Sequence, residues 1–454
     1  MMSDPVEASL KRLVKRACDG LKGSKEDDLR TRSALVVQTV GKSLRLVRGE
    51  LPLWGDAARL VPKGYLDDET LEVLRNIQKD QRFHAYDGRL LWQLALGFDM
   101  RATDVPVTFL SDYFETLGSL RFKEPHFRNR FSEMLRFFDT DKPFRLKIVA
   151  PLWGFVAIPR RVTLDDAQVR KIDLASVARL VNEDMNVLMT FSEQEPFEYV
   201  LEFAFDMPKI TTSGDPQEAR ESGGNWDSIY QIATRINQEL ALLRCFTNQV
   251  PRAVTFGHYY EGWPASFFKG GPRIELPWRN SISSPAPALT SPEIRSFRKQ
   301  RERFLAIPAD SRQLLSAAAR RIAVAEDAAY AGDQVVDFVS AIEGLLLSDV
   351  NVEAKYRFKE RVAFLLGSRP KRLGLAKKAA DLYDLRSAVV HGRVVPDQSG
   401  FGVVFLEGLQ ARKKGRHGSV EIAAREARQM AKDCLQKITV LGGQVPDWDE
   451  VILG

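Results

Sequence analysis

The C-terminal third of the chain carries apolar residues at helical spacing almost without interruption. Val336, Val339, Ile342 and Leu345 recur every three or four residues, a pattern typical of a helix that buries one face. We expect Asp310 with Gln313 to form a capping box, Asp333 to cap the next helix, and Gly367 to end a third in the left-handed conformation. The pattern predicts a bundle of helices over residues 310–330, 333–346, 353–366, a segment ending at 392, and 419–441, with a hairpin-like or irregular stretch at 394–418.

The pattern upstream is mixed. Helical spacing is present near residues 4–20, 28–48, 66–100, 108–138 and 226–246. Apolar, β-branched and aromatic runs predict strands over residues 144–159, 197–205, 253–260 and 266–276. The predicted fold class is therefore an α+β N-terminal region followed by an all-α C-terminal helical bundle.

A run rich in Ser, Pro and Ala at residues 281–293 separates these two regions, and proline disfavours a regular helix or a central strand. We predict an α+β domain over residues 1–280, which could contain two subdomains and serve as a sensor. A linker is expected over residues 281–304, and the helical bundle over 305–454.

The net charge of +6 is unevenly distributed. Residues 291–454 hold 27 Lys and Arg against 21 Asp and Glu, so their excess equals that of the whole chain. Basic clusters attract polyanions such as RNA, although a solvated surface is the simpler alternative for each cluster. The candidate RNA-binding residues are Arg369, Lys371, Arg372, Lys377 and Lys378 in one cluster, and Arg412, Lys413, Lys414 and Arg416 in the other.

Other classes of protein find little support in the sequence. No apolar run is long enough for a membrane span, and the first residues do not form a signal peptide, so we expect no membrane association. The three cysteines lie far apart, as in a protein of the reducing cytoplasm. Residues 41–43 (GKS) lack the first glycine of a phosphate-binding loop, and no histidines have metal-ligand spacing. We predict neither a cofactor nor a metal.

One predicted helix combines an arginine on its packing face with a histidine at its end. At about 100° per residue, Arg386 falls within the apolar arc that contains Leu375, Ala379 and Leu382. Arginine is rarely buried without a partner. One interpretation is structural: Arg386 pairs with Asp337 or Glu343, and His391 caps the helix.

The other interpretation is catalytic. A histidine exchanges protons near neutral pH, and an arginine offers a fork of donors to a phosphate. Together they suit the cleavage of RNA by its own 2′-hydroxyl, without a metal. Residues five apart on a helix diverge by about 140°, so either the last turn opens or a second copy of the chain completes the site.

The segment LYDLRSAVVHG resembles the signature of HEPN domains, particularly the Apea-like group, through Tyr383, Arg386, Ser387, Val390, His391 and Gly392. Residues 338–349 and 355–367 are similar to two further helices of that family. The resemblance covers about residues 305–441, a third of the chain. It implies an Arg-x4-6-His ribonuclease motif formed by Arg386 and His391, and a homodimer in which two copies build one cleft. Ser387 stands where other family members often carry Asn, Asp or His.

We therefore expect a HEPN-type endoribonuclease, in a toxin-like or antiviral role implied by the family, whose N-terminal region responds to a trigger. Tyr383, Ser387, Asp337 and Glu343 are the predicted supporting residues. The alternatives are a noncatalytic HEPN module that binds RNA or dimerises a sensor, and a protein–protein adaptor.

Overall fold

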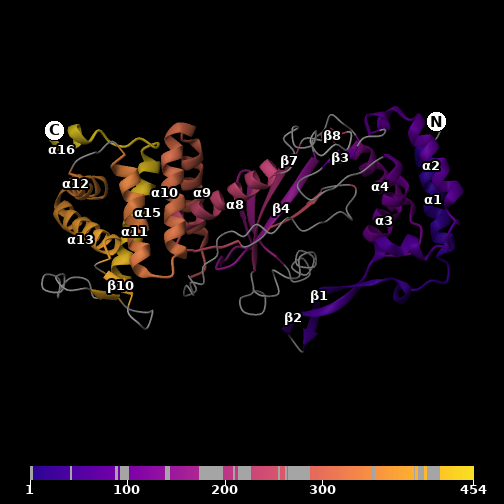
Figure 1. Cartoon of the computed structure of the whole chain (residues 1–454), viewed down its shortest axis with the longest axis horizontal. Coiled ribbons are helices and arrows are strands. Elements are labelled where there is room, and N and C mark those ends of the chain that lie inside the picture. Colours follow the sequence, from indigo (N-terminus) through magenta and orange to yellow (C-terminus); the bar gives the residue numbers. More distant parts are fainter. Residues whose placement is uncertain are drawn as a thin grey trace. The chain divides into compact units, whose positions relative to one another are not determined.

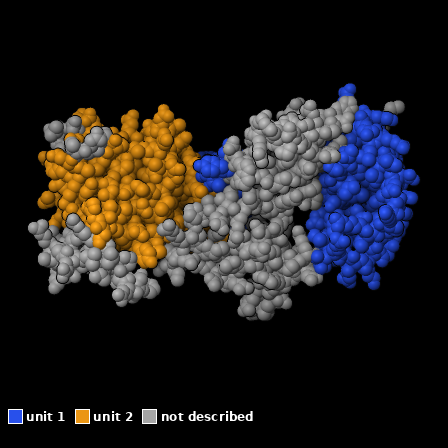
Figure 2. Space-filling view, in the orientation of Figure 1, with its two compact units in different colours: residues 1–151, 163–234, 255–274 blue, residues 152–162, 235–254, 275–454 orange. Residues whose placement is uncertain are grey.

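The structure is a computed structural model of the 454-residue chain. It describes residues 4–40, 43–86, 90–92, 102–138, 144–172, 198–207, 210–212, 226–253, 256–260, 263, 287–348, 353–392, 394–396, 403–405 and 420–453. The chain divides into two compact units, coloured separately in Figure 2. Unit 1 contains residues 1–151, 163–234 and 255–274, and unit 2 contains residues 152–162, 235–254 and 275–454.

The described part of unit 1 combines helices, including the first residues of α8 (Trp226–Phe246), with antiparallel strands. The other helices are α1 (Pro5–Gly20), α2 (Asp67–Lys79), α3 (Val105–Leu117) and α4 (Glu124–Phe138). Short 3-10 turns cover Glu26–Asp28, Trp54–Leu60, Gln81–Tyr86 and Ala102–Asp104. Aromatic rings fill the helical core, where Phe109 packs on Phe127 and Trp263 packs on Phe137 and Phe138. Burial of these rings is the main force that holds the helices together.

A five-stranded sheet has the strand order β5-β6-β7-β4-β9. These strands are β4 (Phe144–Leu152), β5 (Arg161–Thr163), β6 (Ala167–Lys171), β7 (Tyr199–Met207) and β9 (Gly257–Tyr260). Two pairs, β6 with β7 and β4 with β9, are antiparallel. A separate antiparallel pair joins β3 (Leu90–Trp92) to β8 (Ile210–Thr212). The strands predicted at 144–159, 197–205 and 253–260 are thus confirmed in their main part, whereas residues 266–276 lie outside the described residues.

The prediction of a helix near residues 28–48 is wrong. Strands β1 (Thr31–Val40) and β2 (Ser43–Pro52) form an antiparallel hairpin, in which Val36 opposes Val47 and Val40 opposes Ser43. The sequence alternates apolar and polar residues only imperfectly here, so period 2 and period 3.6 are hard to separate, and cross-strand pairing decides the outcome.

The helix predicted over 66–100 ends early, at Lys79. Asp80 adopts extended backbone, and its carboxylate accepts a hydrogen bond from the Arg82 N–H at 2.9 Å. This side-chain bond favours a turn over another helical residue. The helical region 108–138 is divided in two because Gly118 has φ 58° and ends α3.

Unit 2 contains the C-terminal helical bundle (Figure 1). Its helices are α9 (Ser291–Ala306), α10 (Ala309–Asp327), α11 (Ala331–Leu346), α12 (Ala354–Leu366), α13 (Arg372–Val390), α15 (Val420–Val440) and α16 (Trp448–Leu453). A 3-10 turn at Arg369–Lys371 precedes α13, and β10 (Val394–Pro396) pairs with β11 (Val403–Phe405). Helix α11 lies at the centre of the bundle, packed against α10, α12, α13 and α15. The mixed α and β architecture with a helical C-terminal region agrees with the sequence analysis.

Helix α8 (Trp226–Phe246) occupies the range predicted for it, and its residues from 235 onward belong to unit 2. Residues 291–304, expected to be linker, form most of α9. Thr290 and Glu293 make a capping box, and Pro292 lies in the first turn, where a helix tolerates proline. The serine and proline residues therefore start a helix here.

Three predicted helix ends are corrected. Helix α11 begins at Ala331 with Tyr330 as its N-cap residue, so Asp333 lies in the first turn and does not cap the helix. Helix α10 begins after Pro308, which has no side-chain cap, so Asp310 lies within the first turn. Gly367 has φ −103°, which is not left-handed. A Cβ at Gly367 would lie 2.6 Å from the Ala363 carbonyl oxygen and 2.9 Å from Leu375 Cδ1. Close packing, and not a left-handed turn, is therefore what requires glycine at this position.

None of the described helices combines the length and the apolar character that crossing a membrane would require.

Candidate functional site

Helix α13 presents the candidate residues at its C-terminal end. It packs against α11 and α12 and buries Ala379, Leu382, Leu385 and Ala388. Val390 is 53% exposed, so the apolar face expected from the sequence does not continue to the last residue of α13. Arg386 lies beside this buried stripe and faces α11, where it contacts Glu343.

Arg386 contacts a carboxylate of α11. Its Nη2 lies 3.3 Å from Glu343 Oε2, and the two side chains are 29% and 20% exposed. Its Nε is buried and has no hydrogen-bond partner among the described residues. Glu343 is thus the carboxylate that accompanies Arg386, whereas Asp337 lies 3.5 Å from Arg321. The pairing of Arg386 with a carboxylate, suggested from the sequence with Asp337 or Glu343, is therefore present with Glu343.

Tyr383 belongs to the same group. Its ring packs on Phe358 at 5.2 Å between centroids, and the Glu343 carboxylate lies near enough to its hydroxyl to influence its pKa. Burial raises the pKa of Tyr383, and the nearby charge of Glu343 raises it further, so the phenol remains a donor at neutral pH. Tyr383, Glu343 and Arg386 therefore form one chain of polar contacts between α11 and α13.

His391 lies at the exposed end of α13. It is the C-cap residue, and its backbone N–H donates to the Ser387 carbonyl oxygen at 3.0 Å. Gly392 follows with φ 65°, a left-handed conformation that closes the helix. The His391 side chain is therefore open to solvent, while Ser387 is half-buried and contributes its carbonyl to the helix end.

The structure gathers some of the predicted residues and separates others. Arg386, Glu343 and Tyr383 come together between α11 and α13. His391 sits five residues after Arg386, where the direction of the side chain differs by about 140° on a regular helix. Helix α13 stays regular through Val390, so the last turn does not open to bring the pair together.

Some side chains of the basic cluster at residues 369–378 already have partners within the protein, and others are exposed. Arg372 stacks on the Phe364 ring at 4.0 Å and donates to the Gly367 carbonyl at 3.2 Å. Lys378 pairs with Glu426 at 2.8 Å. Arg369, Lys371 and Lys377 are exposed. The second cluster, Arg412, Lys413, Lys414 and Arg416, lies outside the described residues.

A buried polar network in unit 2 was missed by the sequence analysis. Lys432 on α15 contacts Glu326 at 2.9 Å and the Thr247 carbonyl at 3.2 Å. Arg428 also pairs with Glu326 at 2.6 Å. Burial lowers the pKa of Lys432, and the Glu326 carboxylate opposes that shift. These groups join α10, α15 and the segment after α8, and sequence spacing alone could not reveal partners so far apart along the chain.

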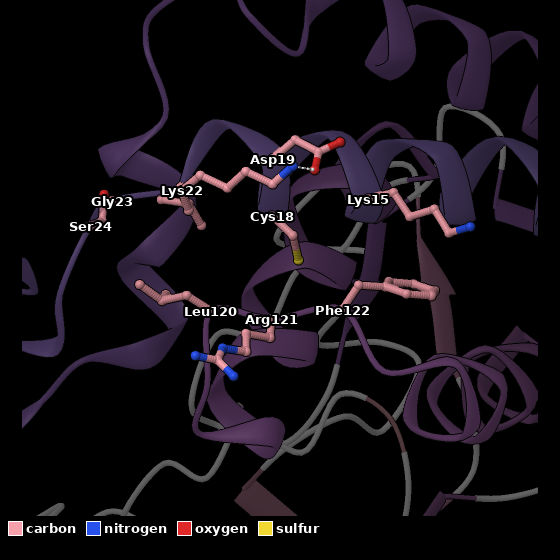
Figure 3. A pocket seen from close by; sticks show the side chains of 10 residues that line it. Lys15, Cys18, Asp19, Lys22, Gly23, Ser24, Leu120, Arg121 and Phe122 are labelled. Carbon is pink, nitrogen blue, oxygen red and sulfur yellow. Dashed lines mark ion pairs between the residues drawn. The ribbon is translucent and has the colours of Figure 1, made fainter.

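A pocket of about 620 Å³ in unit 1 is a second candidate (Figure 3). Lys22 pairs with Asp19 at 2.8 Å, and Lys15 lies 5.1 Å from the Phe122 ring centroid. Burial raises the pKa of the Cys18 thiol to about 12, and the charge of Asp19 acts in the same direction, so the thiol is not a nucleophile at neutral pH. The other lining residues are Leu21, Gly23, Ser24, Leu120 and Arg121. This lining could accept a small molecule but offers no activated catalytic group.

The cysteines Cys18, Cys245 and Cys434 are buried free thiols. In the part of the chain that the structure describes, no three His, Cys, Asp or Glu side chains are grouped to hold a metal ion.

The chain was also compared with known proteins. Neither the protein-family models, nor the curated proteins, nor the solved structures contain a match to it. The candidate site is therefore interpreted from its own geometry and chemistry.

Proposed function

We propose that this protein is a metal-independent RNA endonuclease of the HEPN type, with His391 and Arg386 as its catalytic residues. The observation that carries the proposal is that one helix end presents an exposed imidazole and a guanidinium held in place by a carboxylate. The imidazole is open to solvent and can reach a substrate, while the guanidinium is held in a defined position by Glu343. The resemblance of the segment at 382–392 to the HEPN signature supports the same assignment.

The proposed chemistry uses the RNA's own 2′-hydroxyl. His391 removes the proton from the 2′-hydroxyl, the 2′-oxygen attacks the adjacent phosphorus, and the bond from phosphorus to the 5′-oxygen breaks. An imidazolium returns a proton to the departing 5′-oxygen. The products are a 2′,3′-cyclic phosphate and a 5′-hydroxyl. Arg386 stabilises the charge that accumulates on the pentavalent phosphorus.

The divergence of the two side chains favours a homodimer as the active form. Arg386 of one copy and His391 of another could face one phosphodiester without distortion of α13. Tyr330 and Val390 are 48% and 53% exposed, and Gly332 lies close to Val389, so apolar surface is present at this end of α11 and α13. Such surface suits contact with a second copy. A cytoplasmic location and a sensory role for the N-terminal region, in toxin-like or antiviral defence, belong to the same proposal.

A noncatalytic module that binds RNA or dimerises a sensor is the second candidate. The pairing of Arg386 with Glu343 favours it, because a carboxylate that neutralises the guanidinium weakens its attraction to a phosphate. This candidate predicts RNA retention without cleavage.

Cleavage of a mixed RNA in the presence of a chelator distinguishes the two candidates. His391→Ala is expected to reduce the rate by about 100-fold or more, the range lost with a general acid or base. Arg386→Ala should reduce it by a similar factor, the range lost with one donor that stabilises developing charge. Arg425→Ala, which removes an exposed arginine from α15, is the matched control and should retain the rate. Equal cleavage by all four proteins would refute the proposed catalytic site, and RNA binding without cleavage by the wild type would support the second candidate.

A further inference from the structure

We infer that the exposed face of helix α9 is an RNA-binding surface separate from the proposed catalytic site. We call this surface the α9 cationic face, and it consists of Arg295, Arg298, Lys299 and Arg303. All four side chains are exposed. The inference rests on the proposed function only for the identity of the polyanion as RNA.

The four cations share one side of the helix. At about 100° per residue, Arg298, Lys299 and Arg303 lie at −60°, +40° and +80° from Arg295, an arc of about 140°. The buried residues occupy the opposite side and are Ile294, Phe297, Arg301 and Phe304. Glu302 is the single carboxylate within the arc, so the face carries a net charge of about +3.

The packing of α9 fixes the direction of this face. Arg301 forms a bidentate pair with Glu239 of α8, with Nε and Nη2 at 2.9 Å and 2.8 Å from its two oxygens. The Phe304 ring packs on Phe246 at 6.2 Å between centroids. Since Arg301 is fully buried and its fork has one good geometry, α9 cannot rotate without breaking the pair. The cationic face therefore stays directed to solvent.

These charges contribute little to the fold. Within the described part of the chain, no ion pair connects any of the four to a carboxylate. Other exposed arginines differ, as Arg12 pairs with Glu72 and Arg128 pairs with Glu124. Lys299 lies four residues from both Arg295 and Arg303, and like charges at this spacing destabilise a helix. A ligand that neutralises the face would remove this repulsion.

A nucleic-acid backbone fits the face better than a small anion. Arg295 and Arg303 are eight residues apart, or about 12 Å along the helix axis. One strand of double-stranded DNA advances about 3.4 Å per phosphate along its axis, so a nucleic-acid backbone of similar rise would place about three or four phosphates along this length. Three of the four cations are arginines, whose donor forks suit phosphate oxygens.

The α9 cationic face is remote from Arg386 within unit 2. Helix α9 packs on α15, α15 packs on α11, and α11 packs on α13. Figure 1 shows α9 and α13 on different sides of the bundle. Loss of charge on α9 should therefore weaken RNA binding and leave the residues of the proposed catalytic site undisturbed.

The test measures binding of the full chain to a fluorescein-labelled single-stranded RNA with 2′-O-methyl groups, which attack by the 2′-oxygen cannot cleave. Fluorescence anisotropy is followed over a range of salt concentrations. The variant combines Arg295→Gln, Arg298→Gln, Lys299→Gln and Arg303→Gln. The matched control removes four exposed arginines of unit 1 that have carboxylate partners: Arg12→Gln, Arg59→Gln, Arg128→Gln and Arg136→Gln.

We expect the α9 variant to lose about 10-fold or more in affinity at low salt. The slope of log K against log salt should fall in magnitude by about 0.7 for each lost phosphate contact, or by about 2 to 3 in total. The control should change affinity by less than about twofold. Thermal unfolding of both proteins should resemble that of the wild type, since the replaced side chains are exposed.

Several outcomes would overturn the inference: no RNA binding by the wild type, unchanged affinity and slope in the α9 variant, or an equal loss in the control. Binding of labelled polyglutamate is measured in the same way. If the α9 variant loses affinity for polyglutamate and keeps its affinity for RNA, the partner is an acidic protein surface and not RNA. Failure of the proposed function is a separate result, because a wild type that binds this RNA through α9 but cleaves no RNA leaves the inference intact.

Discussion

The Arg386 side chain contacts a carboxylate within the fold, whereas the His391 side chain is exposed. Substitution of Arg386 should therefore affect stability as well as activity, and substitution of His391 should affect activity alone. Arg386 is half-buried against Glu343, and its loss would leave that carboxylate with fewer partners between α11 and α13. His391 is exposed, and the hydrogen bond that it makes at the helix end uses its backbone N–H, which any residue can supply.

We therefore predict that Arg386→Ala lowers the free energy of unfolding by about 1–2 kcal/mol, the cost of leaving a partly buried charged group unpaired. His391→Ala should change it by less than about 0.5 kcal/mol, as is usual for an exposed side chain. Urea unfolding measures both. A His391→Ala variant as unstable as Arg386→Ala would mean that the imidazole packs in the fold and is not free for catalysis.

At the scale of elements, α9 depends on one buried ion pair. Glu239 is fully buried and accepts from Arg301 and, at 2.9 Å, from Arg235. Replacing Arg301 with an apolar residue would leave the buried Glu239 carboxylate, among the residues that the structure describes, with the more exposed Arg235 as its ion-pair partner. A buried charge that loses its partner is far more costly than the intact pair is stabilising.

Arg301→Met is accordingly expected to reduce the free energy of unfolding by about 3–5 kcal/mol. The double variant Arg301→Met with Glu239→Leu should recover most of that loss, since both charges are then removed. Arg303→Met, the same substitution on the exposed face of α9, is the control and should lie within about 0.5 kcal/mol of the wild type. Chemical denaturation of the full chain provides all four values, and an equal effect of the two methionine substitutions would contradict this role of Arg301.

At the scale of the whole molecule, the C-terminal unit is larger than the helical bundle that the sequence predicts. Unit 2 includes residues 152–162 and 235–254. From these segments Arg244 and Arg252 pair with Asp327 of α10, at 2.7 Å and 3.0 Å. The Thr247 carbonyl in turn accepts from the buried Lys432. The bundle therefore relies on chain segments far upstream of its own helices.

A fragment of residues 305–454 should consequently fail to form the native bundle, because Asp327 and Lys432 lose these partners and the core loses α8 and α9. We expect it to lack the near-ultraviolet circular dichroism of packed aromatic side chains and to unfold without a cooperative thermal transition. A fragment of residues 226–454, which restores Arg244, Thr247 and Arg252, should regain both. A cooperative transition in the shorter fragment would show that residues 305–454 fold independently.

Elements that depend on contacts between near neighbours in the chain are predicted correctly from the sequence, whereas elements that depend on distant contacts are missed. Helices α10 to α13 and α15 were predicted from apolar spacing, which depends on neighbours three or four residues away. The hairpin β1–β2 was missed because its pairing joins residues up to 21 positions apart, such as Thr31 and Pro52. The linker prediction overlooked α9, because Pro292 is unfavourable inside a helix but acceptable in its first turn.

The sequence by itself determined helices α10 to α13 and α15, the end of α13 at His391 and Gly392, and the presence of an arginine on the inner side of that helix. These features depend on periodicity and end signals that are local in the chain. Only the tertiary structure decided that Glu343 accompanies Arg386, that α9 turns four cations to solvent, and that residues 235–254 belong with the bundle. Such features require contacts between residues tens to hundreds of positions apart, and no local pattern specifies which of several carboxylates or faces will meet.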